Sequence, residues 1–448
     1  MAHRLDAFAA CMILMLSVDA SAASLMEAYQ AALLNDPTLR AARHERDAGQ
    51  QALPIARAGL LPNVSFSSSR LNNSGDRSLA PGAPSQPLDY RSVQDAISLR
   101  QPLFNLDSFL RYRQGGVQSD YSEAVFSKKE GELAIRVASA YFDLLLAAEK
   151  LAFSNAEVAS FSDQQKLAQR RNSAGEGTVT EIAETSARLA IAEANRADAI
   201  DLMSVAKAAL EQMTGQPMDA FRALKWDLAP LEVQPASADE WASIALERSP
   251  EIAAQRKLLE SADLDIDRIR SGHLPRLDFV ASVNRTESDT LNTLDQRANV
   301  RSAGLQLTIP LFAGLSVVAQ TKQAVANRER VAAELDAVIN KVQLDVRRWF
   351  LATRTGEIKV AAYERAVDAS MVAVEGTRRG MAAGIRTNTD VLDAQRLLFS
   401  AQRDRAQVRY ESFTSKLKLK GAAGSLSASD IIELDQMLES TQSGSVSR

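Results

Sequence analysis

Four segments of the chain alternate apolar and polar side chains. In the clearest one the apolar positions are Leu277, Phe279, Ala281 and Val283. The four segments are residues 63–70, 92–99, 276–283 and 302–309. Alternation over about ten residues is typical of a strand with one apolar face, and of membrane-barrel strands in particular. An ordinary soluble sheet is the alternative that this pattern leaves open.

The alternation predicts two strand pairs, near residues 62–101 and 275–310. Between the strands of each pair lie polar stretches at 71–90 and 285–299, which we expect to be the outer loops of two hairpins. A closed membrane barrel needs at least eight strands, because an open sheet edge is not tolerated in lipid. A chain with four strands must therefore oligomerise to close a barrel.

Elsewhere the apolar positions recur every three or four residues, as in a helix. The stretch 105–213 is interrupted clearly only at 173–177, which predicts a helical hairpin with arms of about 65 residues, or about 100 Å each. A second hairpin is predicted at 313–420. The seam from Leu189 to Met213 is narrow and rich in alanine, so such a hairpin needs neighbouring helices along its length.

The chain also repeats itself at an offset of about 210 residues. The sequence "QPLF" at 101–104 matches "IPLF" at 309–312, and "GEGTVTEIAE" at 175–184 matches "GIRTNTDVLD" at 384–393. These matches predict an α+β fold made of two tandem repeats. The predicted units are a signal peptide (1–22), a first repeat (23–213), a linker (214–237), a second repeat (238–424) and a tail (425–448).

Composition and charge narrow the class of protein. The formal net charge of the 448 residues is −4, which argues against a nucleic-acid partner because such proteins need a basic face. A basic start, a short apolar run and the small residues Ala20-Ser21-Ala22 predict a cleaved export signal. No later segment has 18 uninterrupted apolar residues, so we expect an exported protein without a helical membrane span.

The repeated turn is the candidate functional site. In each repeat a glycine (Gly175 or Gly384) is followed three residues later by a threonine (Thr178 or Thr387) and then by two acids. The acids are Glu181 and Glu184 in the first repeat, and Asp390 and Asp393 in the second. Thr-x-x-Glu is the capping-box pattern of a helix start and Thr-x-x-Asp a near version of it. Capping accounts for the first acid of each turn and accounts less well for the second.

The export signal, the duplicated helix–strand–strand–helix pattern and the turn "GIRTNTDVLDA" at 384–394 together resemble the TolC family of outer-membrane export ducts. The tail at 416–431 resembles the final segment of that family. The resemblance implies a homotrimer with a 12-stranded outer-membrane β-barrel, four strands per chain, continued by a long α-helical coiled-coil tunnel across the periplasm. It also implies a periplasmic adaptor, an inner-membrane ABC transporter or other pump, an exported substrate, contact with outer-membrane lipid, and no cofactor.

The resemblance further implies that the acidic turns form the periplasmic entrance of the tunnel. There the carboxylates would make a ring that favours cations, and Arg386 would tie neighbouring helices together and hold the aperture shut. Helix capping is the competing interpretation, and it is as strong as the entrance role for Glu181 and Glu184. The first turn also departs from the family pattern, because Gly177 stands where the second turn has Arg386.

The sequence offers no catalytic or metal site. Its three histidines lack the spacing of metal ligands, and no phosphate-binding glycine loop occurs. The favoured interpretation is therefore the outer-membrane duct of a type I secretion system that exports a protein such as a toxin. A multidrug efflux component is the alternative in the same class. A soluble periplasmic coiled-coil scaffold and a secreted enzyme with an unrecognised site are the alternatives in other classes, and nothing in the sequence supports the enzyme.

Overall fold

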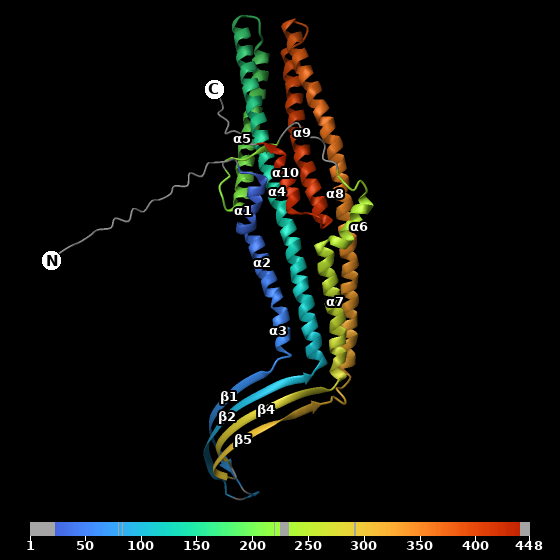
Figure 1. Ribbon diagram of the computed structural model, residues 1–448. Helices are drawn as coiled ribbons and strands as arrows, with labels where there is room; N and C mark the ends of the chain where they lie inside the picture. Colours follow the sequence, from blue (N-terminus) through green and yellow to red (C-terminus); the bar gives the residue numbers. More distant parts are fainter. Residues whose placement is uncertain are drawn as a thin grey trace, which may run out of the picture.

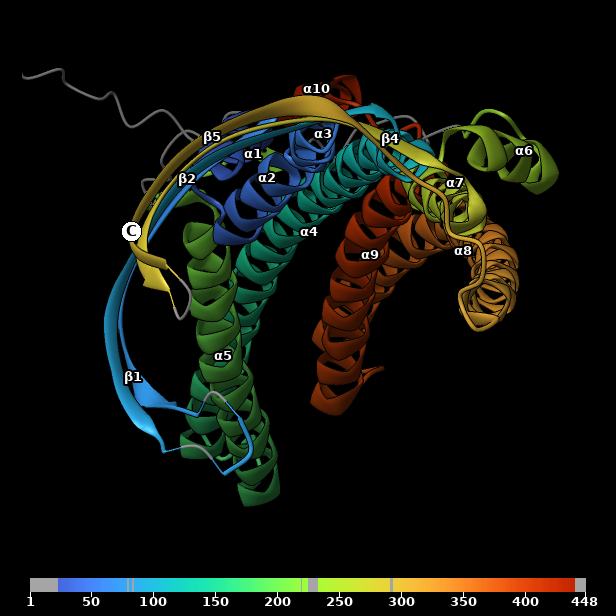
Figure 2. The same cartoon turned by 90° about the horizontal axis from the view of Figure 1, so that it is seen from below.

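The computed structural model describes residues 23–78, 80–82, 84–218, 220–224, 233–290 and 293–439. A four-stranded sheet bent into an arc lies at one end, and a curved layer of long helices extends from it (Figures 1 and 2). The predicted signal peptide lies outside the described residues. Across the described ranges, no helix combines the length and the apolar character that a membrane crossing requires.

Both halves of the chain build the same order of elements: short helices, a strand pair, a very long helix and a shorter returning helix. The first half contains α1 (Leu25–Asn35), α2 (Pro37–Gln50), α3 (Ala52–Ala58), β1 (Asn63–Arg77), β2 (Gln86–Phe104), α4 (Leu106–Ser173) and α5 (Val179–Thr214). The second contains α6 (Ala238–Arg248), α7 (Pro250–Arg270), the 3-10 turn η1 (Ser271–His273), β4 (Arg276–Thr290), β5 (Thr293–Thr308), α8 (Ser316–Ala382) and α9 (Asn388–Ala422). The predicted tandem repeats and α+β class are confirmed, while the predicted limits of the units remain predictions.

The two hairpins are less symmetric than the sequence predicted. The helices α4 and α8 have 68 and 67 residues, but the returning helices α5 and α9 have only 36 and 35. The predicted arms of about 65 residues are therefore wrong for the returning helices, since a break at 173–177 leaves only 178–213, or 36 residues, for the second arm of the first hairpin. The rest of each long helix is covered by other segments, because α1, α2 and α3 pack on α4 and α7 packs on both α4 and α8 (Figure 1).

The end of α5 and the end of α1 meet on the surface of α4, and a hydrogen bond joins them. The helix α5 stops at Thr214 because Gly215 adopts φ 68°, in the left-handed region. Asn35, at the end of α1, donates a hydrogen bond from Nδ2 to the carbonyl of Thr214 (2.7 Å). One part of α4 is therefore covered by α5, and another part by α1, α2 and α3.

The four strands form one antiparallel sheet in the order β1-β2-β4-β5, so β1 and β5 are its edges. Phe66 lies opposite Ile97, and Ile97 lies opposite Val283, so the predicted apolar positions share one face. The strands are longer than predicted, and most of 71–90 and 285–299 is strand rather than loop. The loop prediction was wrong because the backbone pairing continues where both faces are polar and hydrophobic alternation gives no signal.

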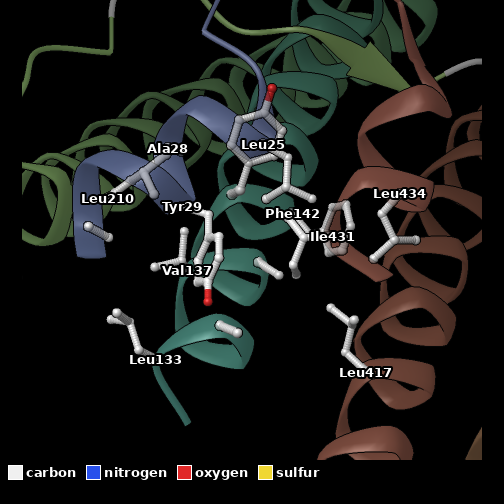
Figure 3. Close-up of a cluster of buried hydrophobic side chains, with 14 of the residues drawn as sticks. Leu25, Ala28, Tyr29, Leu133, Val137, Phe142, Leu210, Leu417, Ile431 and Leu434 are labelled. Atoms are coloured by element: carbon white, nitrogen blue, oxygen red, sulfur yellow. The ribbon is translucent and has the colours of Figure 1, made fainter. Parts of the chain in front are cut away.

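The main apolar core lies near the middle of the helical layer, where α1, α4, α9 and α10 (Ala428–Gln436) meet (Figure 3). Phe142 of α4 packs against Tyr410 and Phe413 of α9, with ring centroids 5.9 and 5.6 Å apart. The linker and tail close this core, because β3 (Ala223–Leu224) pairs with β6 (Leu438–Glu439). The core joins the two repeats at mid-length, and both helical hairpins extend beyond it, away from the sheet.

Candidate functional site

The ends of the helical hairpins that lie farthest from the sheet, which we call the tips, are residues 174–178 and 383–387 (Figure 1). Both tips follow the same backbone path. Gly175 (φ 78°) and Gly384 (φ 73°) adopt the left-handed conformation that glycine enters at little cost. In each tip the amide of the next residue donates to the carbonyl five residues back, at 2.9 Å. The repeated glycine is therefore explained by the turn itself.

Each tip also places one arginine against one glycine, in opposite order. Arg171 and Gly177 occupy the places that Gly380 and Arg386 occupy in the second tip. A Cβ on Gly177 would lie 2.8 Å from the amide nitrogen of Asn172, and one on Gly380 would lie 2.7 Å from Cγ of Arg386. The departure of the first turn from the family pattern is thus an exchange of the two residue types rather than a loss of the arginine.

The first acid of each turn caps its helix, but the two caps differ. Thr387 accepts from the amide of Asp390 (3.2 Å), and the Asp390 carboxylate accepts from the amide of Thr387 (2.9 Å), which makes a complete capping box. Thr178 accepts from the amide of Glu181 (3.2 Å), but the Glu181 carboxylate lies 3.7 Å from Arg171 instead. The prediction of the full box in the first turn is therefore wrong. Arg171, which stands at the place of Gly380, gives Glu181 a cation to pair with.

The second acids of the two turns meet at one cation. Nη2 of Arg188, on α5, lies 3.3 Å from the Glu184 carboxylate and 3.0 Å from the Asp393 carboxylate of α9. Thr389 donates a hydrogen bond from its hydroxyl to the second oxygen of Glu184 (3.2 Å). These contacts, which we call the Arg188 clamp, join the tips of the two hairpins. The clamp residues lie on α5 and α9 just beyond the tip residues themselves, and they explain the acids for which capping accounts less well.

The structure brings together Glu184 and Asp393 but leaves Glu181 and Asp390 in the caps of separate helices. Hydrogen bonding to the Thr387 amide lowers the pKa of Asp390, and the nearby charge of Arg386 lowers it further. Arg188 was missed by the sequence analysis. Its only signal in the sequence is the four-residue spacing from Glu184 on one helix face. The predicted latch of Arg386 between neighbouring helices stays a prediction.

Between the tips and the apolar core, the two hairpins meet through both apolar and polar contacts. Beneath the clamp, Leu392 of α9 packs with Phe161 and Ala192 of the first hairpin. Closer to the core, Tyr410 donates a hydrogen bond to Glu149 (2.6 Å), and burial raises the pKa of this carboxyl. The hairpins are thus firmly joined at the core and more weakly joined toward the tips.

Two comparisons place this architecture among known proteins. The model of the outer membrane efflux protein family matches residues 28–216 and 241–425, one segment in each repeat. The chain belongs to the outer membrane efflux protein family. The solved structure of the CmeC outer membrane channel of Campylobacter jejuni has the same fold, with a TM-score of 0.77 at 17% identity, over 93% of this chain and 90% of that one.

Two curated relatives in the family match almost the full chain. The alkaline protease secretion protein AprF of Pseudomonas aeruginosa is 35% identical over 94% of this chain and 88% of its own length. The proteases secretion protein PrtF of Dickeya chrysanthemi is 33% identical over 94% of this chain and 92% of its own length. Outer membrane proteins named TolC also match over most of their length. The predicted TolC-family resemblance and outer-membrane location are confirmed.

Proposed function

We propose that this chain is the outer-membrane exit duct of a type I secretion system and exports a protein. The observation that carries the proposal is the full-length similarity, at 35 and 33% identity, to two proteins named for protease secretion. The proposed partners are a periplasmic adaptor and an inner-membrane ABC transporter. The tips act as the entrance, the helical layer as the tunnel wall and the sheet as the barrel wall, and the chain has no catalytic role.

The proposed assembly is a homotrimer with a 12-stranded barrel. The sheet has two unpaired edges, β1 and β5, whose backbone groups need partners inside a membrane. The helices α5 and α8 lie at opposite ends of the helical arc (Figure 2). On α8, the side chains of Leu344, Leu351 and Ile358 recur every seven residues and are 61–69% exposed. Exposed apolar residues at heptad spacing fit a seam with a helix of the next subunit.

Replacing Leu351 with aspartate is expected to prevent trimer formation, because the new charge would be buried in that seam. Leu351→Met is the matched control, since it changes the same side chain at similar volume without adding a charge. Size-exclusion chromatography with light scattering in detergent measures the oligomeric state of both variants. Intact trimers of the Leu351 variant would show that this stripe is not the subunit seam.

Secretion is tested by deleting the gene and comparing the proteins in the culture medium with those of the complemented strain. We expect at least one secreted protein to disappear on deletion, and sensitivity to dyes and antibiotics to stay unchanged. An unchanged set of secreted proteins with raised drug sensitivity would favour the efflux alternative. A protein that leaves the membrane fraction without detergent would favour the soluble scaffold.

A further inference from the structure

One face of the sheet carries no charged side chain along most of its length. On this face the strands present mainly small hydroxyl, amide and aliphatic side chains. These are Ser65, Ser67, Ser69, Leu71 and Asn73 of β1, Ser92, Gln94, Ala96 and Ser98 of β2, Val280, Ser282, Asn284 and Thr286 of β4, and Ala298, Val300, Ser302, Gly304 and Gln306 of β5. We call these positions the neutral face.

The neutral face is the lumen side of the proposed barrel. The opposite face carries the apolar rows that include Phe66, Ile97 and Val283, and apolar side chains of a barrel face the lipid. Because side chains alternate along every strand, the remaining face must line the lumen. This assignment rests on the proposed function, since it requires the sheet to close into a barrel in the membrane.

Charges on the neutral-face side of the strands occur only near the two ends. Near the helices, Nε of Arg100 donates to the Asp278 carboxylate (3.1 Å), so these two charges offset each other, and Arg276 lies beside them. Arg77 lies at the other end. The lipid side differs: it carries charged residues such as Arg301, which lies opposite Val283, and Arg70 and Asp95, which pair at 3.0 Å.

The hydroxyl groups of the neutral face bond to one another across neighbouring strands. The hydroxyls of Ser65 and Ser98 are 2.8 Å apart, and those of Ser282 and Ser302 are also 2.8 Å apart. The four serines lie in one row across all four strands, because Ser98 is opposite Ser282. Short side chains that bond along the wall leave the lumen wide and offer a passing chain neither a fixed charge nor a deep apolar site.

We propose that the barrel is a neutral exit that does not select cargo by the sign of its charge. A fixed charge on the wall would bind oppositely charged segments of a passing chain and slow them. Conduction requires that each binding site on the path be weak, so a wall without fixed charges lets such segments pass. The cargo that this wall fits is an extended polypeptide with both acidic and basic segments. A small ion or drug with a single charge would find no oppositely charged binding site on this wall.

The reversal potential across a planar bilayer, under a KCl gradient, tests the neutral exit with the purified full-length protein. The wild type is expected to prefer cations. A tip variant with Asp390→Asn, Asp393→Asn and Arg386→Gln keeps the pairs Glu181–Arg171 and Glu184–Arg188. Its cation-to-anion permeability ratio should fall, because the tips lose net negative charge and the neutral face supplies none in its place.

Adding one charge to the tip variant then locates the lumen. Ser302→Asp, on the neutral face of β5, should raise the cation preference of the tip variant, and Asn299→Asp, on the other face of the same strand, should leave it unchanged. Equal effects of the two aspartates would overturn the neutral exit while leaving the channel intact. Failure of the wild type to conduct would instead contradict the proposed function.

Discussion

Replacing Arg188 with serine is expected to make open channels much more frequent in planar bilayers. The substitution removes the only cation of the clamp and leaves the Glu184 and Asp393 carboxylates facing each other across α5 and α9. An exposed ion pair contributes roughly 0.2–1 kcal/mol, so the Arg188–Asp393 pair between α5 and α9 in each of three subunits would favour the closed arrangement by about 0.6–3 kcal/mol. Since every 1.4 kcal/mol is a tenfold change in an equilibrium, the open fraction should rise about threefold to a hundredfold.

The control for this experiment is Arg379→Ser. Arg379 pairs with Glu375 at 2.9 Å near the same tip, but both residues belong to α8, so the pair joins no two helices. The control should conduct like the wild type, and high salt should open the wild type because exposed pairs are screened. Unchanged gating of the Arg188 variant would show that the clamp does not hold the tips. If Arg386→Ser alone opened the channel, the predicted latch between neighbouring helices would be favoured instead.

The Arg188 clamp shows why the site could be predicted only in part. The internal repeat was enough to identify both turns, their glycines and all four acids, because the same local sequence motif occurs in each half of the chain. Glu184 and Asp393 meet through the contact of Arg188 with Asp393, residues 205 positions apart, and no local pattern reports such a tertiary contact. The capping box was assigned to the wrong turn for a similar reason, since the orientation of Glu181 depends on Arg171 across the turn.

In the fold as well, features set by local sequence were predicted and features set by tertiary contacts were not. The strands were predicted where one face is apolar, as at Phe279 and Val283, and were missed where both faces are polar. The long helices were predicted from their periodicity, but their partners were not. The hydrogen bond from Asn35 to the end of α5 at Thr214 joins the two ends of the first repeat, and the helical period cannot show such a contact.

Replacing Gly424 with alanine is expected to destabilise the protein strongly. Gly424 follows α9 with φ +67°, and a Cβ there would lie 2.3 Å from the carbonyl oxygen of Arg248 and 2.8 Å from Cα of Ser249, at the junction of α6 and α7. The left-handed conformation costs an alanine about 1–2 kcal/mol. Backbone atoms cannot move aside as a flexible side chain can, so the overlap should raise the total loss to about 2–5 kcal/mol.

Gly175→Ala separates the two causes of this loss. Gly175 has nearly the same backbone conformation (φ +78°), but a Cβ there meets no other atom within 4 Å. It should therefore lose only the conformational part, about 1–2 kcal/mol. Thermal unfolding of the detergent-solubilised proteins, followed by circular dichroism, compares the two midpoints, and Gly424→Ala should unfold at the lower temperature. Equal midpoints would mean that the α6–α7 junction yields to the new methyl group, and that close packing of α9 against this junction does not hold the second repeat together.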